Sequence, residues 1–339
     1  MIRTAGTLLL GFFLFMPGCS RQGDISLEDA IIEYRNDGGS KHENIGRGML
    51  SEISLVRLGA DGLATSGTCL YYRNGDSMDI VYPDEKKIDA VQLQDAVIAC
   101  SDEKRTALGA GSAVRVYGPG SPDSVELSAA DTGDRIKALL INNGTVYYYK
   151  GHRLFSQGLD QDQPRLLVSD RFSPPYKKYY QVWLHGIKGV LGIVAGSAGS
   201  YYISAVGLSP AKTMVTNISA SSSKIALTDR GVYYIFGGSG NWDLLFFRFA
   251  GKTKQTIRKF KDLRSIELTG SSYIFQDSGG LWIQDYDKNI IKIPFDLGIE
   301  GKYGDFVLLS CSGYVYVTDL RMLMEKLEQL KIKIPELFT

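Results

Sequence analysis

Apolar and polar positions alternate along the chain in short runs separated by glycine and serine turns, and the whole pattern repeats about every forty residues. Each unit contains an apolar strand, a turn, an aromatic-rich strand, a second turn and further strands. A period of two residues is typical of strands that bury one face. The pattern therefore predicts an all-β body made of repeated small sheets.

The clearest copies of this unit cover residues 224–260 and 264–293. On their template, further copies cover residues 53–93, 95–127, 135–168, 180–215 and a last segment that begins near Gly301.

Seven units of four short strands predict a seven-bladed β-propeller. A single blade cannot bury its own apolar faces, so neighbouring blades must cover each other. Six or eight blades, or two stacked β-domains, stay open as alternatives because the copies at 95–127 and 180–215 are degenerate. The units carry no recurrent WD, kelch or quinone-cofactor tryptophan signature, so no propeller subfamily is indicated.

Helical spacing of apolar residues occurs near both ends of the chain. A short helix is predicted behind a Ser26 cap, with one apolar face made of Leu27, Ala30, Ile31 and Tyr34. A second helix is predicted over residues 319–330, with Asp319 as its cap. We expect residues 332–335 to supply the outer strand of the last blade, because proline is tolerated at a sheet edge.

The first eighteen residues have the order of an export signal. Arg3 is followed by an apolar stretch over residues 8–16 and then by Gly18 and Cys19. The stretch is too short to span a bilayer comfortably, and polar residues follow it, which is typical of a cleaved signal. The segment resembles the signal peptide of bacterial lipoproteins, whose lipobox has a small residue before the cysteine.

That resemblance implies cleavage before Cys19, lipid on the Cys19 thiol and a membrane as the first partner. An ordinary secretory signal cut nearby is the alternative. Ser20 resembles the residue found at this position under default sorting to the outer membrane, so we favour the outer over the inner membrane of a bacterial envelope.

The chain is thus divided into a signal peptide (1–18), a tether with a short helix (19–49) and a propeller domain (50–339) that includes helix 319–330. The tether helix could dock the body near the membrane, but packing on its own domain is favoured.

Composition supports the all-β prediction, since 38 glycines suit tight turns and 20 tyrosines with 14 phenylalanines suit pleated surfaces. The 38 Lys and Arg residues nearly balance the 37 Asp and Glu residues. This balance gives no global field for steering nucleic acid, so no nucleic-acid partner is predicted.

No catalytic, cofactor-binding or metal-binding residue is identified. His42, His152 and His185 are far apart and lack metal-ligand spacing. The chain has no nucleophile elbow, phosphate loop or dinucleotide fingerprint. Residues 285–296 superficially match a calcium loop, but Ile290 stands where glycine is required, so a hairpin turn is expected.

After lipidation of Cys19, an odd number of cysteines remains, so at most one internal disulfide can form. Cys69 and Cys100 are expected in adjacent blades, and Cys311 lies in the last blade, which ring closure brings towards the first. Buried free thiols are favoured over a disulfide.

Two surface segments are weighed as binding sites. One is basic, and its charges are Lys252, Lys254, Arg258, Lys259, Lys261 and Arg264. It could meet lipid headgroups or an acidic partner, but a solvated edge strand protected by lysines is favoured. The other is the proline-braced loop Ser173–Tyr180, which could contact protein or glycan, although a linker is favoured.

Anchor and propeller together resemble the propeller lipoproteins of the outer-membrane β-barrel assembly machinery. The resemblance is one of architecture, and it implies a non-enzymatic scaffold for protein partners in envelope assembly. One alternative is an envelope enzyme that acts on glycans through channel carboxylates, among which Asp95 and Glu267 carry no pairing signature. The other is a surface adhesin or ligand receptor.

Overall fold

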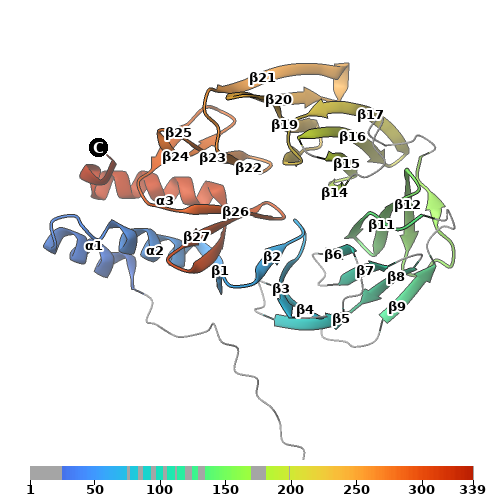
Figure 1. Cartoon of the computed structure of the whole chain (residues 1–339), viewed down its shortest axis with the longest axis horizontal. Coiled ribbons are helices and arrows are strands. Elements are labelled where there is room, and N and C mark those ends of the chain that lie inside the picture. The colour runs from blue at the N-terminus through green and yellow to red at the C-terminus, as the bar shows by residue number, and fades with distance from the viewer. Residues whose placement is uncertain are drawn as a thin grey trace, which may run out of the picture.

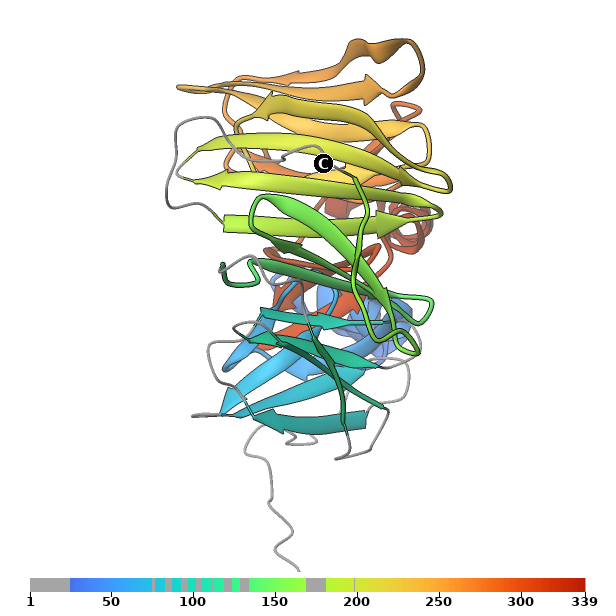
Figure 2. The same cartoon turned by 90° about the vertical axis from the view of Figure 1, so that its right-hand side faces the viewer.

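The computed structural model describes residues 25–74, 77–82, 87–92, 97–101, 105–110, 113–118, 124–128, 134–168, 181–197 and 199–338. Within these ranges the strands form seven antiparallel sheets of four strands each, arranged around a central axis (Figure 1). Figure 2 shows the ring from its side, with successive sheets stacked on one another. The predicted seven-bladed propeller is confirmed.

Six blades take their strands from consecutive segments, and the first strand of each lies nearest the axis. The first three blades contain β2 (Leu63–Thr65), β3 (Leu70–Asn74), β4 (Ser77–Tyr82), β5 (Lys87–Gln92), β6 (Val97–Cys100), β7 (Thr106–Ala110), β8 (Ala113–Tyr117), β9 (Ser124–Ser128), β10 (Ala138–Asn142), β11 (Thr145–Lys150), β12 (Arg153–Gly158) and β13 (Arg165–Leu166).

The next three blades contain β14 (Gln181–Ile187), β15 (Val190–Ser197), β16 (Ser200–Leu208), β17 (Ala211–Ala220), β18 (Ile225–Leu227), β19 (Gly231–Gly238), β20 (Asn241–Arg248), β21 (Thr253–Phe260), β22 (Ser265–Leu268), β23 (Ser272–Asp277), β24 (Gly280–Asp285) and β25 (Ile290–Ile293). A one-turn 3₁₀ segment, η1 (Ala250–Lys252), precedes β21.

The turns show why these residues form hairpins. β10 and β11 are joined by Asn143 and Gly144, whose φ angles are +47° and +66°. Asparagine and glycine tolerate this left-handed region, and two such residues give the tight turn whose twist matches the paired strands.

The seventh blade joins the two ends of the described chain. Its inner strands are β26 (Gly298–Tyr303), β27 (Phe306–Cys311) and β28 (Tyr314–Thr318), and its outer strand is β1 (Ser54–Gly59). β1 pairs with β28 in antiparallel register, so the ring is closed by backbone hydrogen bonds between segments far apart in sequence.

This closure corrects two expectations. Residues 332–335 do not supply the outer strand, because β1 occupies that position and helix α3 (Leu320–Lys333) extends into this segment. The first blade begins at Leu63, since the strand that follows Ile53 belongs to the last blade. The repeat period alone could not assign β1 to the last blade, because its sequence resembles that of any other blade strand.

Three helices, α1 (Leu27–Asn36), α2 (His42–Ile53) and α3, form what we call the helical wedge between the sixth and seventh blades (Figure 1). Their apolar side chains share one core with both blades. From the wedge this core includes Ile45, Met49, Leu50, Leu323 and Leu327, all 0% exposed. The helices therefore cover apolar faces of the sixth and seventh blades. At other places in the ring, neighbouring blades cover such faces for each other.

The caps expected from the sequence are present. Asp29 N–H donates to the Ser26 hydroxyl at 3.1 Å, and the Asp319 carboxylate accepts from the N–H groups of Arg321 and Met322. A 3₁₀ segment, η2 (Pro335–Phe338), follows α3. None of the helices in the described ranges has the length and apolar character that crossing a membrane requires.

Helix α2 was not predicted from the sequence, because its glycines weaken the helical pattern. The structure gives these glycines a packing role. A Cβ at Gly48 would lie 2.9 Å from the backbone Cα of Leu27, and a Cβ at Gly46 would lie 3.1 Å from the Phe295 side chain. The absence of side chains therefore lets α2 approach α1 and the segment between β25 and β26 closely.

We predict that Gly48→Ala lowers the free energy of unfolding by about 1–3 kcal/mol, because the clash with Leu27 backbone exceeds the gain in helix propensity of about 1 kcal/mol. Urea denaturation measures this. Gly46→Ala is the matched comparison, since it gains the same propensity but meets a side chain that can shift, and it should cost less. A Gly48→Ala protein as stable as wild type would contradict the packing.

Candidate functional site

The inner ends of all seven blades surround a cavity of about 590 Å³ at one end of the central channel. We call it the channel cavity. It opens among the turns that follow the inner strands, and one lining residue from each blade in turn is Thr68, Cys100, Asn142, His185, Leu227, Leu268 and Lys302.

Lys302 crosses the channel from the seventh blade. Its Nζ donates to the backbone carbonyl oxygens of Ile225 at 2.6 Å and Leu268 at 3.3 Å, which belong to the inner strands of the fifth and sixth blades. Its own carbonyl oxygen accepts from the Thr65 hydroxyl at 2.9 Å, and this bond reaches the first blade. Burial lowers the pKa of Lys302, and the nearest carboxylates only partly oppose this effect.

A second ammonium group in the channel region is paired. Lys224 Nζ lies 2.6 Å from Glu267 Oε2, and Glu267 is only 2% exposed. Lys224 directly precedes β18 and Glu267 lies on β22, so the pair joins the inner strands of adjacent blades. Glu267, one of the two carboxylates considered for glycan chemistry, is therefore ion-paired with a lysine. The other, Asp95, lies outside the described residues.

His185 lies on the inner strand β14 and lines the channel cavity. Its Nε2 atom is buried and has no hydrogen-bond partner among the described residues. Burial, together with the nearby charge of Lys302, lowers the pKa of His185 to about 3. The imidazole is therefore neutral at physiological pH.

The other two histidines are remote from this site. His42 is the first residue of α2, and His152 lies in the turn between β11 and β12. Across the described ranges, no group of three or more His, Cys, Asp or Glu residues is arranged to hold a metal ion. The run 285–289 is a hairpin turn as expected, in which the Asp285 carboxylate accepts from the backbone N–H of Asn289 at 2.9 Å.

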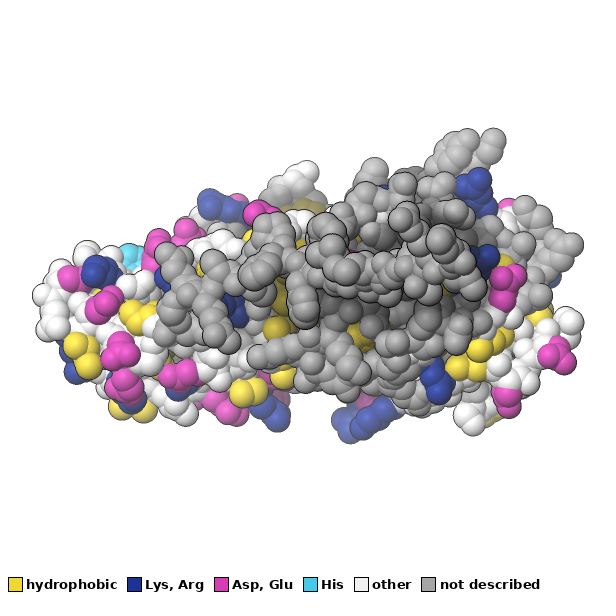
Figure 3. Space-filling view, turned by 90° about the horizontal axis from the view of Figure 1, so that it is seen from below, with side chains coloured by type: hydrophobic (Ala, Val, Ile, Leu, Met, Phe, Trp, Pro, Cys, Tyr) yellow, Lys and Arg dark blue, Asp and Glu magenta, His cyan; other side chains and the backbone are white. Residues whose placement is uncertain are grey.

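Charges of both signs surround the mouth of the channel. A smaller cavity of about 390 Å³ adjoins the first and shares Lys188, Thr269 and Asp305 with it. Asp229 and Asp319 also line this smaller cavity. Figure 3 shows the molecule from below the view of Figure 1. On the described part of that surface, acidic, basic and apolar side chains are interspersed, so no broad field of one sign covers it.

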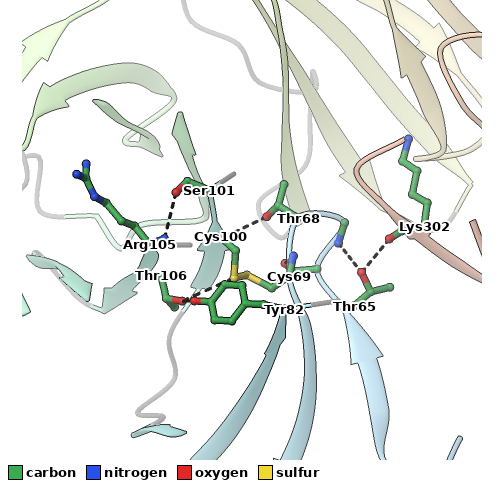
Figure 4. Close-up of a disulfide and its surroundings, with 11 residues drawn as sticks. Thr65, Thr68, Cys69, Tyr82, Cys100, Ser101, Arg105, Thr106 and Lys302 are labelled. Carbon is green, nitrogen blue, oxygen red and sulfur yellow. Dashed lines mark hydrogen bonds between the residues drawn. A yellow bond between two sulfur atoms is a disulfide. The ribbon is translucent and has the colours of Figure 1, made fainter. Parts of the chain in front are cut away.

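A disulfide forms part of the channel wall. Cys69 and Cys100 are bonded, with their Cα atoms 5.2 Å apart, and they join the first two blades (Figure 4). Nearby, the hydroxyl groups of Tyr82 and Thr106 form a hydrogen bond of 2.8 Å. The expectation of free thiols is wrong for this pair, whereas Cys311 is buried and free as expected.

The middle of the basic segment, Lys254, Arg258 and Lys259, lies on β21, the outer strand of the fifth blade, as expected of an edge strand. Lys252 lies in η1, and Lys261 and Arg264 follow the strand. Arg258 is partly withdrawn from solvent, because its guanidinium group donates to the Gln284 side chain and lies 4.5 Å from the centre of the Phe275 ring. Lys252, Lys254 and Lys259 are exposed. Cys19 and loop Ser173–Tyr180 lie outside the described residues.

The residues that converge on the channel were only partly visible in the sequence. His185 and Glu267 were named there without a role, and Lys224 and Lys302 were not singled out. Their common signal is a charged or titratable residue at the inner strand of a blade, where neighbouring positions are apolar. The repeat alignment could have grouped them, but only the closed ring places Lys302 beside the fifth and sixth blades.

Comparisons with known proteins add evidence on the fold alone. No family model matches the sequence, and no curated protein matches it either. A chain in the crystal structure of a mitotic checkpoint complex is similar with a TM-score of 0.50 and 9% identity, over 78% of this chain and 94% of that chain. The extracellular domain of a putative one-component system from B. thetaiotaomicron gives 0.46 and 10% identity, over 78% and 40%.

We predict that the disulfide contributes roughly 3–4 kcal/mol to the free energy of unfolding, because it restricts a long loop of the unfolded chain. The double variant Cys69→Ala, Cys100→Ala should lose this amount in urea denaturation, and a strong reductant should bring wild type to the same level. Cys311→Ala is the control and should keep its sensitivity to reductant. A wild-type stability unaffected by reductant would count against the bridge.

We also predict a His185-dependent loss of stability in acid. Because its folded pKa of about 3 lies below the ordinary value of 6.5, the unfolded chain binds the proton more readily between these values. Stability is therefore complete above the upper value and falls as pH decreases through this window, by at most about 1.4 kcal/mol per pH unit.

Urea denaturation at a series of pH values tests this, most cleanly above about pH 5, where most carboxylates are still charged. His185→Gln should show a shallower decline than wild type, whereas His42→Gln, at an exposed position, should keep the wild-type slope. Equal slopes for wild type and His185→Gln would show that His185 is not buried in its neutral form.

Proposed function

We propose that this protein is a lipoprotein of the bacterial cell envelope, held to a membrane by lipid on Cys19, whose propeller is a non-enzymatic scaffold for protein partners. The β-propeller fold is compatible with this role, because mutual burial of blade faces gives a stiff disc with a large rim and two faces. Ser20 after the anchor residue favours the outer over the inner membrane. Export through the signal peptide would place the propeller in the periplasm or at the cell surface.

The observation that carries the proposal is the short distance between the anchor residue and the packed body. Ile25 is the sixth residue after Cys19, and its side chain packs against the core shared by the helical wedge and two blades. An extended backbone covers at most about 3.6 Å per residue, so Cys19 lies within roughly 22 Å of Ile25. Lipid on Cys19 would hold the wedge side of the disc close to the membrane.

The disulfide supports the same location. Bonds such as Cys69–Cys100 persist in oxidising compartments and are rare in the bacterial cytoplasm. Several acyl chains on one cysteine would anchor the body durably, because each buried methylene contributes about 0.8 kcal/mol.

We predict that Cys19→Ala abolishes incorporation of a labelled fatty acid and moves the protein from the membrane fraction to the soluble fraction. Metabolic labelling with an alkyne fatty acid, followed by fractionation, measures both. Cys311→Ala, which removes a different cysteine, should keep label and fractionation unchanged. Label retained in Cys19→Ala would refute the anchor.

The scaffold role has a separate readout. Cross-linking in native membranes should give adducts of the wild-type chain with a defined envelope protein, and Cys19→Ala should lose them at equal expression because the disc is no longer held nearby. A lipid-labelled wild-type chain that gives no protein adduct would overturn the scaffold role and leave the anchor standing.

A further inference from the structure

The channel cavity contains polar groups whose hydrogen bonding is incomplete. The Lys302 ammonium has three N–H donors, and two of them reach the carbonyl oxygens of Ile225 and Leu268. Within the described ranges the third donor has no acceptor. His185 Nε2, also buried, is likewise without a partner there. Buried polar groups are almost always paired, so an unpaired imidazole nitrogen in the same cavity as an incompletely bonded ammonium group requires an explanation.

The two ammonium groups of the channel region differ in their partners. Lys224 is neutralised by Glu267 at 2.6 Å, whereas Lys302, among the described residues, has only carbonyl oxygens within hydrogen-bond distance, and Glu267 and Asp305 act on it from farther away. Asp305 and Lys188 both line the channel cavity and the smaller cavity that adjoins it. The channel therefore holds one half-buried cation without a bonded carboxylate, an arrangement that favours the approach of an anion.

We propose that the channel cavity binds a small organic monocarboxylate, with its carboxylate between Lys302 Nζ and His185 Nε2. The neutral imidazole would present Nε2–H as a donor, and the ammonium would supply its remaining N–H. Ile187, Tyr303 and Phe306 line the same cavity, are only half-buried, and give apolar surface for the body of the ligand. The volume of about 590 Å³ lies within the range of small-molecule sites.

A carboxylate fits this site better than a phosphate group. Phosphate sites supply several donors, through arginine side chains or a series of backbone N–H groups at a helix N-terminus. The described lining includes no arginine, and the N-terminus of α3, whose N–H groups the Asp319 carboxylate already caps, lines only the adjoining smaller cavity. One ammonium and one imidazole match a single negative charge shared by two oxygens.

A purely structural role explains only part of this arrangement. Lys302 does connect its own blade with three others, and two of these bonds go to carbonyl oxygens of inner strands. That role needs neither the unpaired imidazole nor a cavity beside the ammonium. The binding site is independent of lipidation, so its test does not depend on the proposed anchor.

The test uses the full chain purified in detergent and a panel of small aliphatic and aromatic monocarboxylates, including hexanoate and phenylacetate. Each acid is paired with its primary amide, which has nearly the same shape and no charge. We expect calorimetry to show binding of at least one carboxylate and affinity for its amide lower by about tenfold or more, because the amide cannot neutralise Lys302.

Two variants separate binding from stability. Lys302→Met should lose carboxylate binding by about tenfold or more, while Lys254→Met on the outer strand should bind as wild type does. If Lys302→Met does not fold, His185→Gln supplies the second test, with weaker binding expected. In the wild-type chain, the His185 imidazole resonances should shift on addition of the acid and not of the amide.

Further ligands in the same assay show whether the carboxylate belongs to a free acid or to the C-terminus of a peptide. A short peptide with a free C-terminus that binds better than the free acids, and whose amidated form does not bind, would assign the site to chain termini. Inorganic phosphate that binds more tightly than every acid would overturn the preference for carboxylate. The proposal as a whole fails if no acid binds up to millimolar concentrations, or if acids and amides bind equally.

Discussion

Pairing of β1 with β28 is the contact on which the rest of the structure depends. Each four-stranded sheet has two faces to bury and is too small to stand alone, so every blade relies on its neighbours. A ring satisfies this requirement for all blades only when its ends meet. Here the outer strand of the last blade comes from the N-terminal side, so the closing contact is a ladder of backbone hydrogen bonds and cannot form locally.

Closure also creates the channel site. Lys302 lies on β26, the inner strand of the closing blade, and its bonds reach the inner strands of the fifth and sixth blades. On the other side, Gly304 N–H donates to the Gly67 carbonyl oxygen at 2.8 Å, which ties the same blade to the first. The cavity wall therefore includes segments that only the complete ring brings together, and the ammonium group cannot be placed by local structure alone.

The repeated strands could be predicted from the sequence because they depend on local alternation, and copies such as 224–260 match the fifth blade closely. Features that depend on distant contacts could not. Gly46 and Gly48 weaken the helical pattern of α2, because their value lies in close packing against Phe295 and Leu27. The Cys69–Cys100 bond depends on how two blades meet. That His185 Nε2 has no partner among the described residues depends on the geometry of the whole channel.

The helical wedge links closure to the N-terminal side of the chain. α2 ends at Ile53 and β1 begins at Ser54, while α3 begins directly after β28 and its cap. Because Ser54 is opposite Thr318, both helices leave the same end of the closing pair and pack into one core. Any pull on the chain before Ile25 would therefore act first on the largely apolar packing of α1 and α2 and only then on β1. With lipid on Cys19, the burial that keeps the ring closed would also fix how the disc is held at the membrane.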